Sequence, residues 1–280
     1  MVGFISPDSY RQFAQAVKHK TRYVHAEGLR AFLATVMESS ETRRVSIKQS
    51  RIFWRAQRGY AWRTEDAGTE GEFEVPAASG PERMVPKAEL VSDGRVNPRG
   101  IPCLYLATTK ETAMAEVRPW VGSYISLGQF TLMRDVSMVD CSRDERLFPN
   151  WLLANDVGQE LPVEKYEQAV WGEISHALSR PVTPDDSATE YVPTQILAEA
   201  FRAHGYDGVA YRSLLGDGFN IALFDCSCAE LTNCCLYEAK TVKFTFEQRD
   251  NPYFVRKHYK ELQKQALAAP KRRRAKSIRR

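Results

Sequence analysis

Short apolar runs alternate with segments of helical periodicity between residues 103 and 224 of this 280-residue chain. The run 103–107 has the length and composition of a buried strand. Thr108 and Glu111 then have the spacing of a capping box, in which two side chains bond to free backbone N–H groups at a helix start. Pro119 ends the helix that this motif predicts. This alternation of strand and helix predicts an α+β fold.

The remaining elements follow from the same two periodicities. Residues 8–48 carry apolar side chains such as Phe13 and Phe32 at helical spacing, which predicts helices there. The stretch 64–98 is rich in Gly, Pro, Glu and Ser and predicts a long surface loop. Further helices are expected at 164–178, at 194–204 with Thr194 as N-cap and Gly205 after its last turn, and at 253–268. Strands are expected at 52–55, in one or two segments of 124–139, and at 208–211, 220–224 and 240–247.

Positive charge is concentrated at the end of the sequence. The net charge is +4, but Pro270–Arg280 contain seven Lys or Arg residues and no acid, so the remaining residues carry a net charge of −3. The acidic balance of the body argues against nucleic-acid binding there. For the tail, weak binding of polyanions and a purely solubilising role are both open.

The first residues lack the long apolar segment of a secretory signal, and no apolar run approaches the roughly 18 residues of a membrane span. The chain can bury a core without disulfides, because 43% of its residues are apolar. We therefore expect a cytoplasmic protein with reduced cysteines. Cys226, Cys228, Cys234 and Cys235 are spaced too tightly for a zinc knuckle and have no histidine nearby, so no metal is expected.

Arginines stand in segments that are otherwise apolar or turn-forming. Arg55 follows Phe53 and Trp54 in a strand-like run, and Arg95 and Arg99 lie in a Gly- and Pro-containing turn. A guanidinium keeps its charge on burial and its planar fork binds phosphate oxygens bidentately, so these side chains could hold a phosphate. Ordinary solvated arginines are the alternative.

Polar residues also follow the buried strands. Glu116 lies on the helix after the strand that contains Tyr105, where a carboxylate would be partly desolvated. Ser213 and Asn220 flank a glycine turn after another strand, a common place for ligand contacts. Ser213 lacks the Gly-x-Ser-x-Gly setting of a hydrolase nucleophile, so a hydrogen bond to a ligand is the more plausible role. A solvated helix glutamate and a turn serine are the alternatives.

Taken together and in this order, these residues resemble the RES-domain family, which is named for an Arg, a Glu and a Ser. The resemblance covers about residues 50 to 226. It departs from the family at Val96, where an aromatic is common, and in the wide separation of Arg55 from Arg95. The segments that carry it are Phe53–Ala56, Gly94–Gly100, Leu104–Ala107, Ala113–Glu116, Tyr191–Gln195, Tyr206–Ser213 and Asn220–Phe224.

The resemblance implies an ADP-ribosyltransferase-like mixed β core with flanking helices. It divides the chain into a helical N-terminal extension (1–48), a RES-type catalytic domain (49–250) and a C-terminal helix with the basic tail (251–280). Members of the family act as toxins in toxin–antitoxin pairs. An antitoxin of the Xre type is therefore an expected partner.

The activity that the resemblance implies is cleavage of the nicotinamide–ribose bond of NAD, as a glycohydrolase with water or a phosphorylase with inorganic phosphate as acceptor. NAD would be the substrate, without a metal. In that reaction Arg55 and Arg95 would grip the pyrophosphate, with Arg99 as a third candidate. Tyr105 would form a wall for the nicotinamide, Glu116 would stabilise the developing cation, and Ser213 and Asn220 would orient the nicotinamide or ribose.

Two other functions stay open from the sequence. One is an ADP-ribosyltransferase that modifies a protein target. The other is a nucleic-acid-binding protein that uses the basic tail and carries a degenerate catalytic domain.

Overall fold

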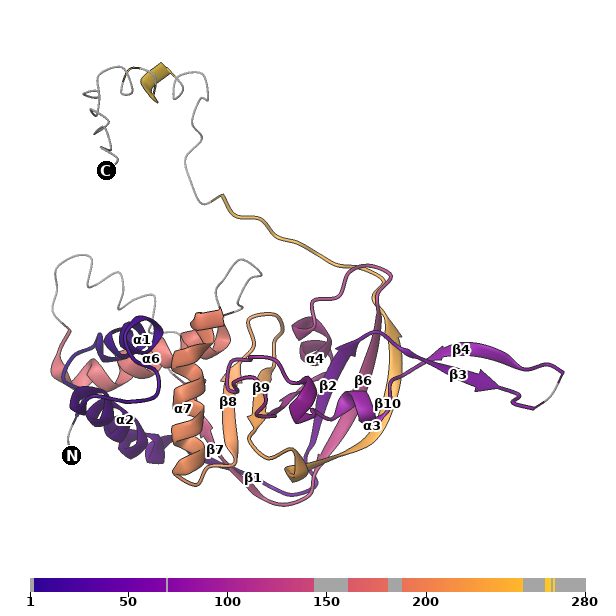
Figure 1. Cartoon of the computed structure of the whole chain (residues 1–280), viewed down its shortest axis with the longest axis horizontal. Coiled ribbons are helices and arrows are strands. Elements are labelled where there is room, and N and C mark those ends of the chain that lie inside the picture. The colour runs from indigo at the N-terminus through magenta and orange to yellow at the C-terminus, as the bar shows by residue number, and fades with distance from the viewer. Residues whose placement is uncertain are drawn as a thin grey trace, which may run out of the picture. The chain divides into compact units, whose positions relative to one another are not determined.

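A computed structural model describes residues 3–68, 70–143, 161–180, 188–248, 260–262 and 264. Over these residues eight strands form one mixed sheet in the order β1-β7-β8-β9-β5-β2-β6-β10 (Figure 1), in which only β7 and β8 run parallel. The sheet and its helices confirm the α+β class. In sheet order the strands are β1 (Arg44–Ile47), β7 (Val136–Asp140), β8 (Gly208–Arg212), β9 (Phe219–Leu223), β5 (Leu104–Ala107), β2 (Ile52–Arg58), β6 (Tyr124–Leu132) and β10 (Ala229–Glu238).

Four helices gather beside one part of the sheet (Figure 1). They are α1 (Ser9–His19), α2 (Glu27–Ser40), α6 (Tyr166–Ser179) and α7 (Val192–Ala203). Phe13 of α1 and Phe32 of α2 stack with ring centroids 4.7 Å apart and share a core with Trp171 of α6 and Phe201 of α7. Val209 of β8 belongs to the same core. The N-terminal helices thus bury their apolar faces against the helices that cover the sheet.

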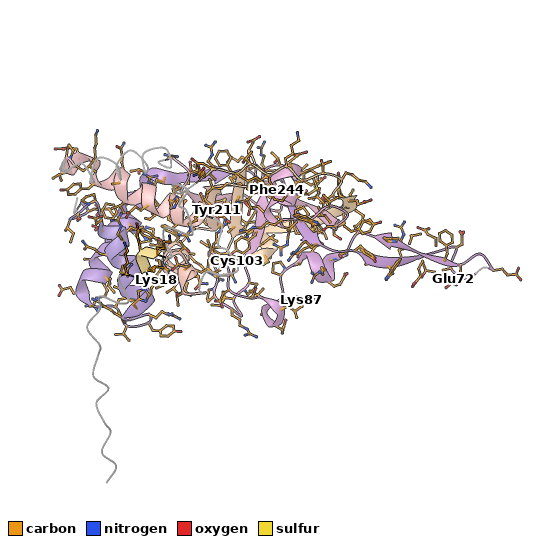
Figure 2. The ribbon with its side chains drawn as sticks, turned by 90° about the horizontal axis from the view of Figure 1, so that it is seen from above. Lys18, Glu72, Lys87, Cys103, Tyr211 and Phe244 are labelled. Atoms are coloured by element: carbon orange, nitrogen blue, oxygen red, sulfur yellow. The ribbon has the colours of Figure 1, made fainter. Side chains whose placement is uncertain are left out.

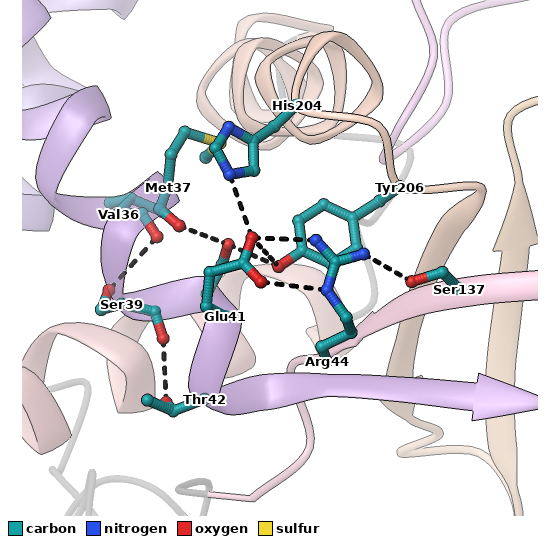
Figure 3. A network of polar contacts seen from close by, with 10 residues as sticks. Val36, Met37, Ser39, Glu41, Thr42, Arg44, Ser137, His204 and Tyr206 are labelled. Carbon is teal, nitrogen blue, oxygen red and sulfur yellow. Dashed lines mark hydrogen bonds and ion pairs between the residues drawn. The ribbon is translucent and has the colours of Figure 1, made fainter.

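A polar network joins the end of α2 to this sheet (Figure 3). Glu41 accepts hydrogen bonds from Arg44 of β1 at 2.8 Å and contacts the His204 ring nitrogen at 3.1 Å. Arg44 also donates to Ser137 of β7 at 2.7 Å, and its guanidinium lies 4.1 Å from the centre of the Tyr206 ring. The hydrogen bond from Arg44 holds the pKa of Glu41 at about 2. This network fixes how the first strand enters the sheet.

Strand β2 buries side chains on both of its faces. Phe53 packs with Met84 of the short helix α3 (Pro81–Met84). Ala56 points to the other face and packs with Ala113 of α4 (Lys110–Glu116). Alternation along one strand therefore places two small helices on opposite faces of the central sheet.

The segment 64–98 is not the unstructured loop expected from its composition. It contains β4 (Phe73–Ala77), which pairs with β3 (Ala61–Glu65), and then α3 and a short 3₁₀ turn at Ala88–Leu90. The β3–β4 hairpin extends away from the sheet, and Glu72 lies near its far end (Figures 1 and 2). The hairpin could not be predicted from the sequence, because it is rich in Gly, Pro and acidic residues, is mostly solvated and lacks a clear apolar alternation.

Other expectations are corrected in detail. Residues 44–47 form strand β1 rather than helix, and 240–247 form no strand, since the last strand is β10. The N-cap of α4 is Thr109, whose side chain accepts from the Thr112 N–H, rather than Thr108. Thr194 lies inside α7 and donates to the Tyr191 carbonyl at 3.0 Å, so it is not the N-cap. The structure confirms the helix expected at 164–178 and the left-handed Gly205. It also confirms the strands expected at 52–55, 103–107, 124–139, 208–211 and 220–224.

The chain forms two compact units, Met1–Thr241 and Val242–Arg280. The domain boundaries expected at residues 48 and 250 stay a prediction. The expected helix at 253–268 and the basic tail fall almost wholly outside the described residues. None of the helices described here is long and apolar enough to cross a bilayer.

Candidate active site

Strands β2 and β5 are paired at one position only. Trp54 lies opposite Ala107, whereas β2 is in register with β6 from Ile52 to Arg58. A cavity of about 690 Å³ is lined by residues of both strands that lie beyond that pair, and by residues of α4, β8 and β9. The parting of two central strands therefore opens the site.

The cavity brings together most of the residues expected from the sequence. Arg55, Arg95, Tyr105, Glu116 and Asn220 all line it, although they come from separate segments of the chain. Ser213 is buried behind Glu116 and contacts it directly. Arg99 is not among the lining residues, and its backbone N–H donates to Asp93.

Glu116, the last residue of α4, is held by two buried side chains. Its Oε1 accepts from the Ser213 hydroxyl at 2.7 Å and from the Asn220 amide at 2.6 Å. Ser213 and Asn220 are 4% and 5% exposed, so both donors are shielded from water. Within the described residues Oε2 of Glu116 accepts no hydrogen bond. One oxygen is thus fixed, and the other is left for a ligand.

A glycine turn between β8 and β9 sets this geometry. Gly218 N–H donates to the Thr112 hydroxyl at 3.0 Å, which docks the turn on the first turn of α4. A Cβ on Gly216 would come within 2.8 Å of the same hydroxyl, and one on Gly218 within 2.6 Å. Glycine is therefore required for the turn to carry Ser213 and Asn220 up to Glu116.

Tyr105 supports the loop that carries Arg95. Its hydroxyl donates to Asn97 Oδ1 at 2.6 Å and accepts from the Val96 N–H at 3.1 Å. Burial raises the pKa of Tyr105 well above its ordinary value, so it stays a neutral donor. A Cβ on Gly94 would lie 2.6 Å from this hydroxyl, which explains the glycine.

Gln195 of α7 holds the same loop from the other side. Its Nε2 donates to the backbone carbonyls of Gly94 and Asn97, both at 2.9 Å. Neither Gln195 nor Asn97 was assigned a role from the sequence. A polar side chain at a position of α7 that is 8% exposed was the available signal, because a buried amide needs fixed partners.

Arg55 is a half-buried cation without a carboxylate partner among the described residues. Its Nη1 donates to the Tyr105 carbonyl at 3.2 Å, while its Nε is buried and bonds to no described group. Burial, together with the nearby charge of Arg83, lowers the pKa of Arg55 to about 10. Positive charge at this depth favours an anion in the cavity.

Arg95 lies against Tyr211 of β8, which Figure 2 labels. The guanidinium carbon of Arg95 is 5.6 Å from the centre of the Tyr211 ring. Burial raises the pKa of Tyr211 to about 12, with Arg95 opposing and Glu116 adding to the rise. Tyr211 therefore lies close enough to both Arg95 and Glu116 to feel the charge of each.

The described residues contain no group of three or more His, Cys, Asp or Glu side chains placed to hold a metal ion. The cysteines are all free thiols here, and Cys234 and Cys235 lie on β10.

The fold and the cavity define an α+β protein in which arginines and a fixed carboxylate line one cavity beside the parting of two strands. The chain belongs to the RES domain family, whose model matches residues 52–247. It is also similar to a chain in the crystal structure of the M. tuberculosis MbcT–MbcA toxin–antitoxin complex, with a TM-score of 0.35 and 15% identity, over 72% of this chain and 92% of that one. No curated protein matches.

Proposed function

We propose that this protein cleaves the nicotinamide–ribose bond of NAD and transfers the ADP-ribose to water or inorganic phosphate. The observation that carries the proposal is the Glu116 carboxylate, held by Ser213 and Asn220 in the same cavity as Arg55 and Arg95. This combination matches the charges of NAD, which has an anionic pyrophosphate and a cationic nicotinamide ribose.

In the proposed reaction the C1′–N bond breaks and both of its electrons go to the nicotinamide nitrogen. Nicotinamide leaves neutral, so no general acid is needed. Positive charge develops at C1′ as in other glycosidic cleavages. Both described donors bond to Oε1 of Glu116, so its Oε2 is left to stabilise that charge or to accept from a ribose hydroxyl. Water then bonds to C1′ through its oxygen and loses a proton to the solvent, whereas inorganic phosphate bonds through an oxygen that carries no proton.

The arginines would bind the pyrophosphate before this step. Arg55 is desolvated and has no carboxylate partner in the described part of the chain, so phosphate oxygens would supply the missing countercharge. Arg95 is presented by a loop that Tyr105 and Gln195 hold in place. The Tyr105 hydroxyl is already used by that loop, which leaves the ring as its contribution to the wall.

Toxicity follows directly from such a reaction, because loss of NAD stops cellular metabolism. We propose that the protein acts as the toxin of a toxin–antitoxin pair, with an antitoxin protein that blocks it. The family membership supports this role.

Incubation of the purified protein with NAD, with and without inorganic phosphate, tests the proposal. We expect release of nicotinamide together with ADP-ribose or its 1″-phosphate, identified by mass spectrometry, and no labelling of protein. Glu116→Gln should stop the release, whereas Glu111→Gln, an exposed carboxylate on the same helix, should not. Intact NAD, or ADP-ribose attached to protein, would overturn the proposal.

A further inference from the structure

A second cavity of about 360 Å³ adjoins the first. Arg55, Gln57, Arg83, Gly94 and Tyr105 line both cavities. The other walls of the second cavity come from α3, from the segment that follows it up to Asp93, and from Asn97 and Cys103. Figure 2 labels two of its lining residues, Lys87 and Cys103. Arg55 thus lies at the boundary between the two cavities.

The net charge of the residues that line the second cavity is positive. Arg83 and Lys87 are exposed, and neither side chain forms an ion pair or a hydrogen bond with another described residue. The same walls carry two carboxylates, Glu82, which accepts from the Gly80 N–H, and Asp93, which accepts from the Arg99 N–H, both at 3.1 Å. Three cations therefore stand against two acids, and this positive balance favours an anion in the cavity.

The residues that line both cavities indicate how a bound dinucleotide would extend from the first cavity into the second. This step rests on the proposed function, which places the bond that breaks at Glu116 and the pyrophosphate at Arg55. The adenosine half then continues past Arg55, where Gly94 and Tyr105 open into the second cavity. Its volume lies at the lower end of the roughly 300–1,000 Å³ range of small-molecule pockets, enough for half of a dinucleotide.

We propose that the second cavity binds a phosphate monoester on the adenosine half, and that the protein accepts dinucleotides carrying a third phosphate, of which NADP is the simplest. A pyrophosphate alone would occupy Arg55 and Arg95. Arg83 and Lys87 then remain for a further dianionic group. An adenosine ribose without that phosphate would leave both of them solvated.

Calorimetric binding of fragments tests this inference without relying on catalysis. The probes are inorganic phosphate, adenosine 5′-monophosphate and adenosine 2′,5′-bisphosphate. We expect the bisphosphate to bind at least about 10-fold more tightly than the monophosphate, equivalent to about 1.4 kcal/mol. Arg83→Gln and Lys87→Gln should each remove most of that difference. Arg51→Gln, an exposed arginine that lines neither cavity, is the matched control and should leave it unchanged.

The outcomes separate this inference from the proposed function. Equal binding of the two nucleotides, or a difference that survives Arg83→Gln and Lys87→Gln, would overturn it. Inorganic phosphate that binds as tightly as the bisphosphate would also overturn it, because the adenosine would then contribute nothing. Turnover of NAD by the wild type is measured separately, and its absence would count against the proposed function alone.

Discussion

The two charged sides of the main cavity differ in what they already contact. Glu116 receives hydrogen bonds from two buried donors, Ser213 and Asn220. Arg55 donates one hydrogen bond, to the Tyr105 carbonyl at 3.2 Å, and its buried Nε has no partner in the described residues. Burial also lowers the pKa of Arg55. The carboxylate is thus held in place through Oε1 before a ligand arrives, whereas the arginine side lacks its countercharge.

This difference has an energetic consequence. A satisfied buried group stabilises the fold or costs little, while a buried charge without a counterion costs free energy. The protein keeps such a charge at Arg55, which is expected of a binding site rather than of a structural ion pair. Truncating the charged side chain on either side should therefore lower activity, but it should lower stability at Glu116 and raise stability at Arg55.

The largest effect is expected at Glu116. Glu116→Gln keeps an oxygen for Ser213 and Asn220 but removes the charge, so turnover should fall about 10²–10³-fold. The thermal midpoint should stay close to that of the wild type, because the shape and both hydrogen bonds are kept. Nicotinamide release and a melting curve measure the two quantities. A folded variant with wild-type turnover would remove Glu116 from the mechanism.

Glu116→Ala tests how much the two hydrogen bonds to Glu116 contribute to stability. It leaves the Ser213 hydroxyl and the Asn220 amide buried without an acceptor, which costs roughly 1–3 kcal/mol in the free energy of unfolding. Urea denaturation of this variant beside Glu116→Gln measures the difference. Equal stability of the two would show that the hydrogen bonds are not part of what fixes the turn.

Arg55 should behave in the opposite way. Arg55→Met removes a buried charge that no described carboxylate balances, so we expect the free energy of unfolding to rise by roughly 1–2 kcal/mol while turnover of NAD is lost. Arg55→Lys keeps charge without the bidentate fork and should raise KM about 10-fold. Denaturation and steady-state kinetics measure these effects. A less stable Arg55→Met variant would mean that Arg55 is structural.

The sequence indicated these two sides unequally. The local sequence pattern was enough to select Glu116, Ser213 and Asn220, because they lie next to short strands with clear turn signals. Arg55 and Arg95 were also singled out, but their meeting depends on the parting of β2 from β5, which no local pattern encodes. Gln195 was missed because its partners are backbone carbonyls about 100 residues earlier in the chain. The β3–β4 hairpin was missed because its composition is that of a loop.

A smaller effect is expected at Gln195, which supports the arginine side indirectly. Gln195→Met keeps the volume but removes the hydrogen bonds to the Gly94 and Asn97 carbonyls, which loosens the loop that carries Arg95. We expect KM to rise a few-fold with kcat nearly unchanged, because Glu116 is untouched. Gln195→Glu is the companion variant. It replaces the donor by an acceptor facing two carbonyls and should raise KM further. An equal fall in kcat and kcat/KM would place Gln195 in the chemical step instead.

The smallest effect on catalysis is expected from the basic tail, which carries more positive charge than the cavity. Seven Lys or Arg residues lie between Pro270 and Arg280, outside the family match at residues 52–247. Arginines in the cavity act through burial, which strengthens their attraction for phosphate, whereas the attraction between charges in water is screened by salt within about 10 Å at 0.1 M. Truncation after Ala269 should therefore leave kcat and KM for NAD unchanged. Retention on a nucleic-acid column should fall, most clearly at low salt, because counterion release drives such binding. A folded truncation that has lost turnover would show that charge outside the cavity takes part in catalysis, and would break the distinction between the cavity arginines and those of the tail.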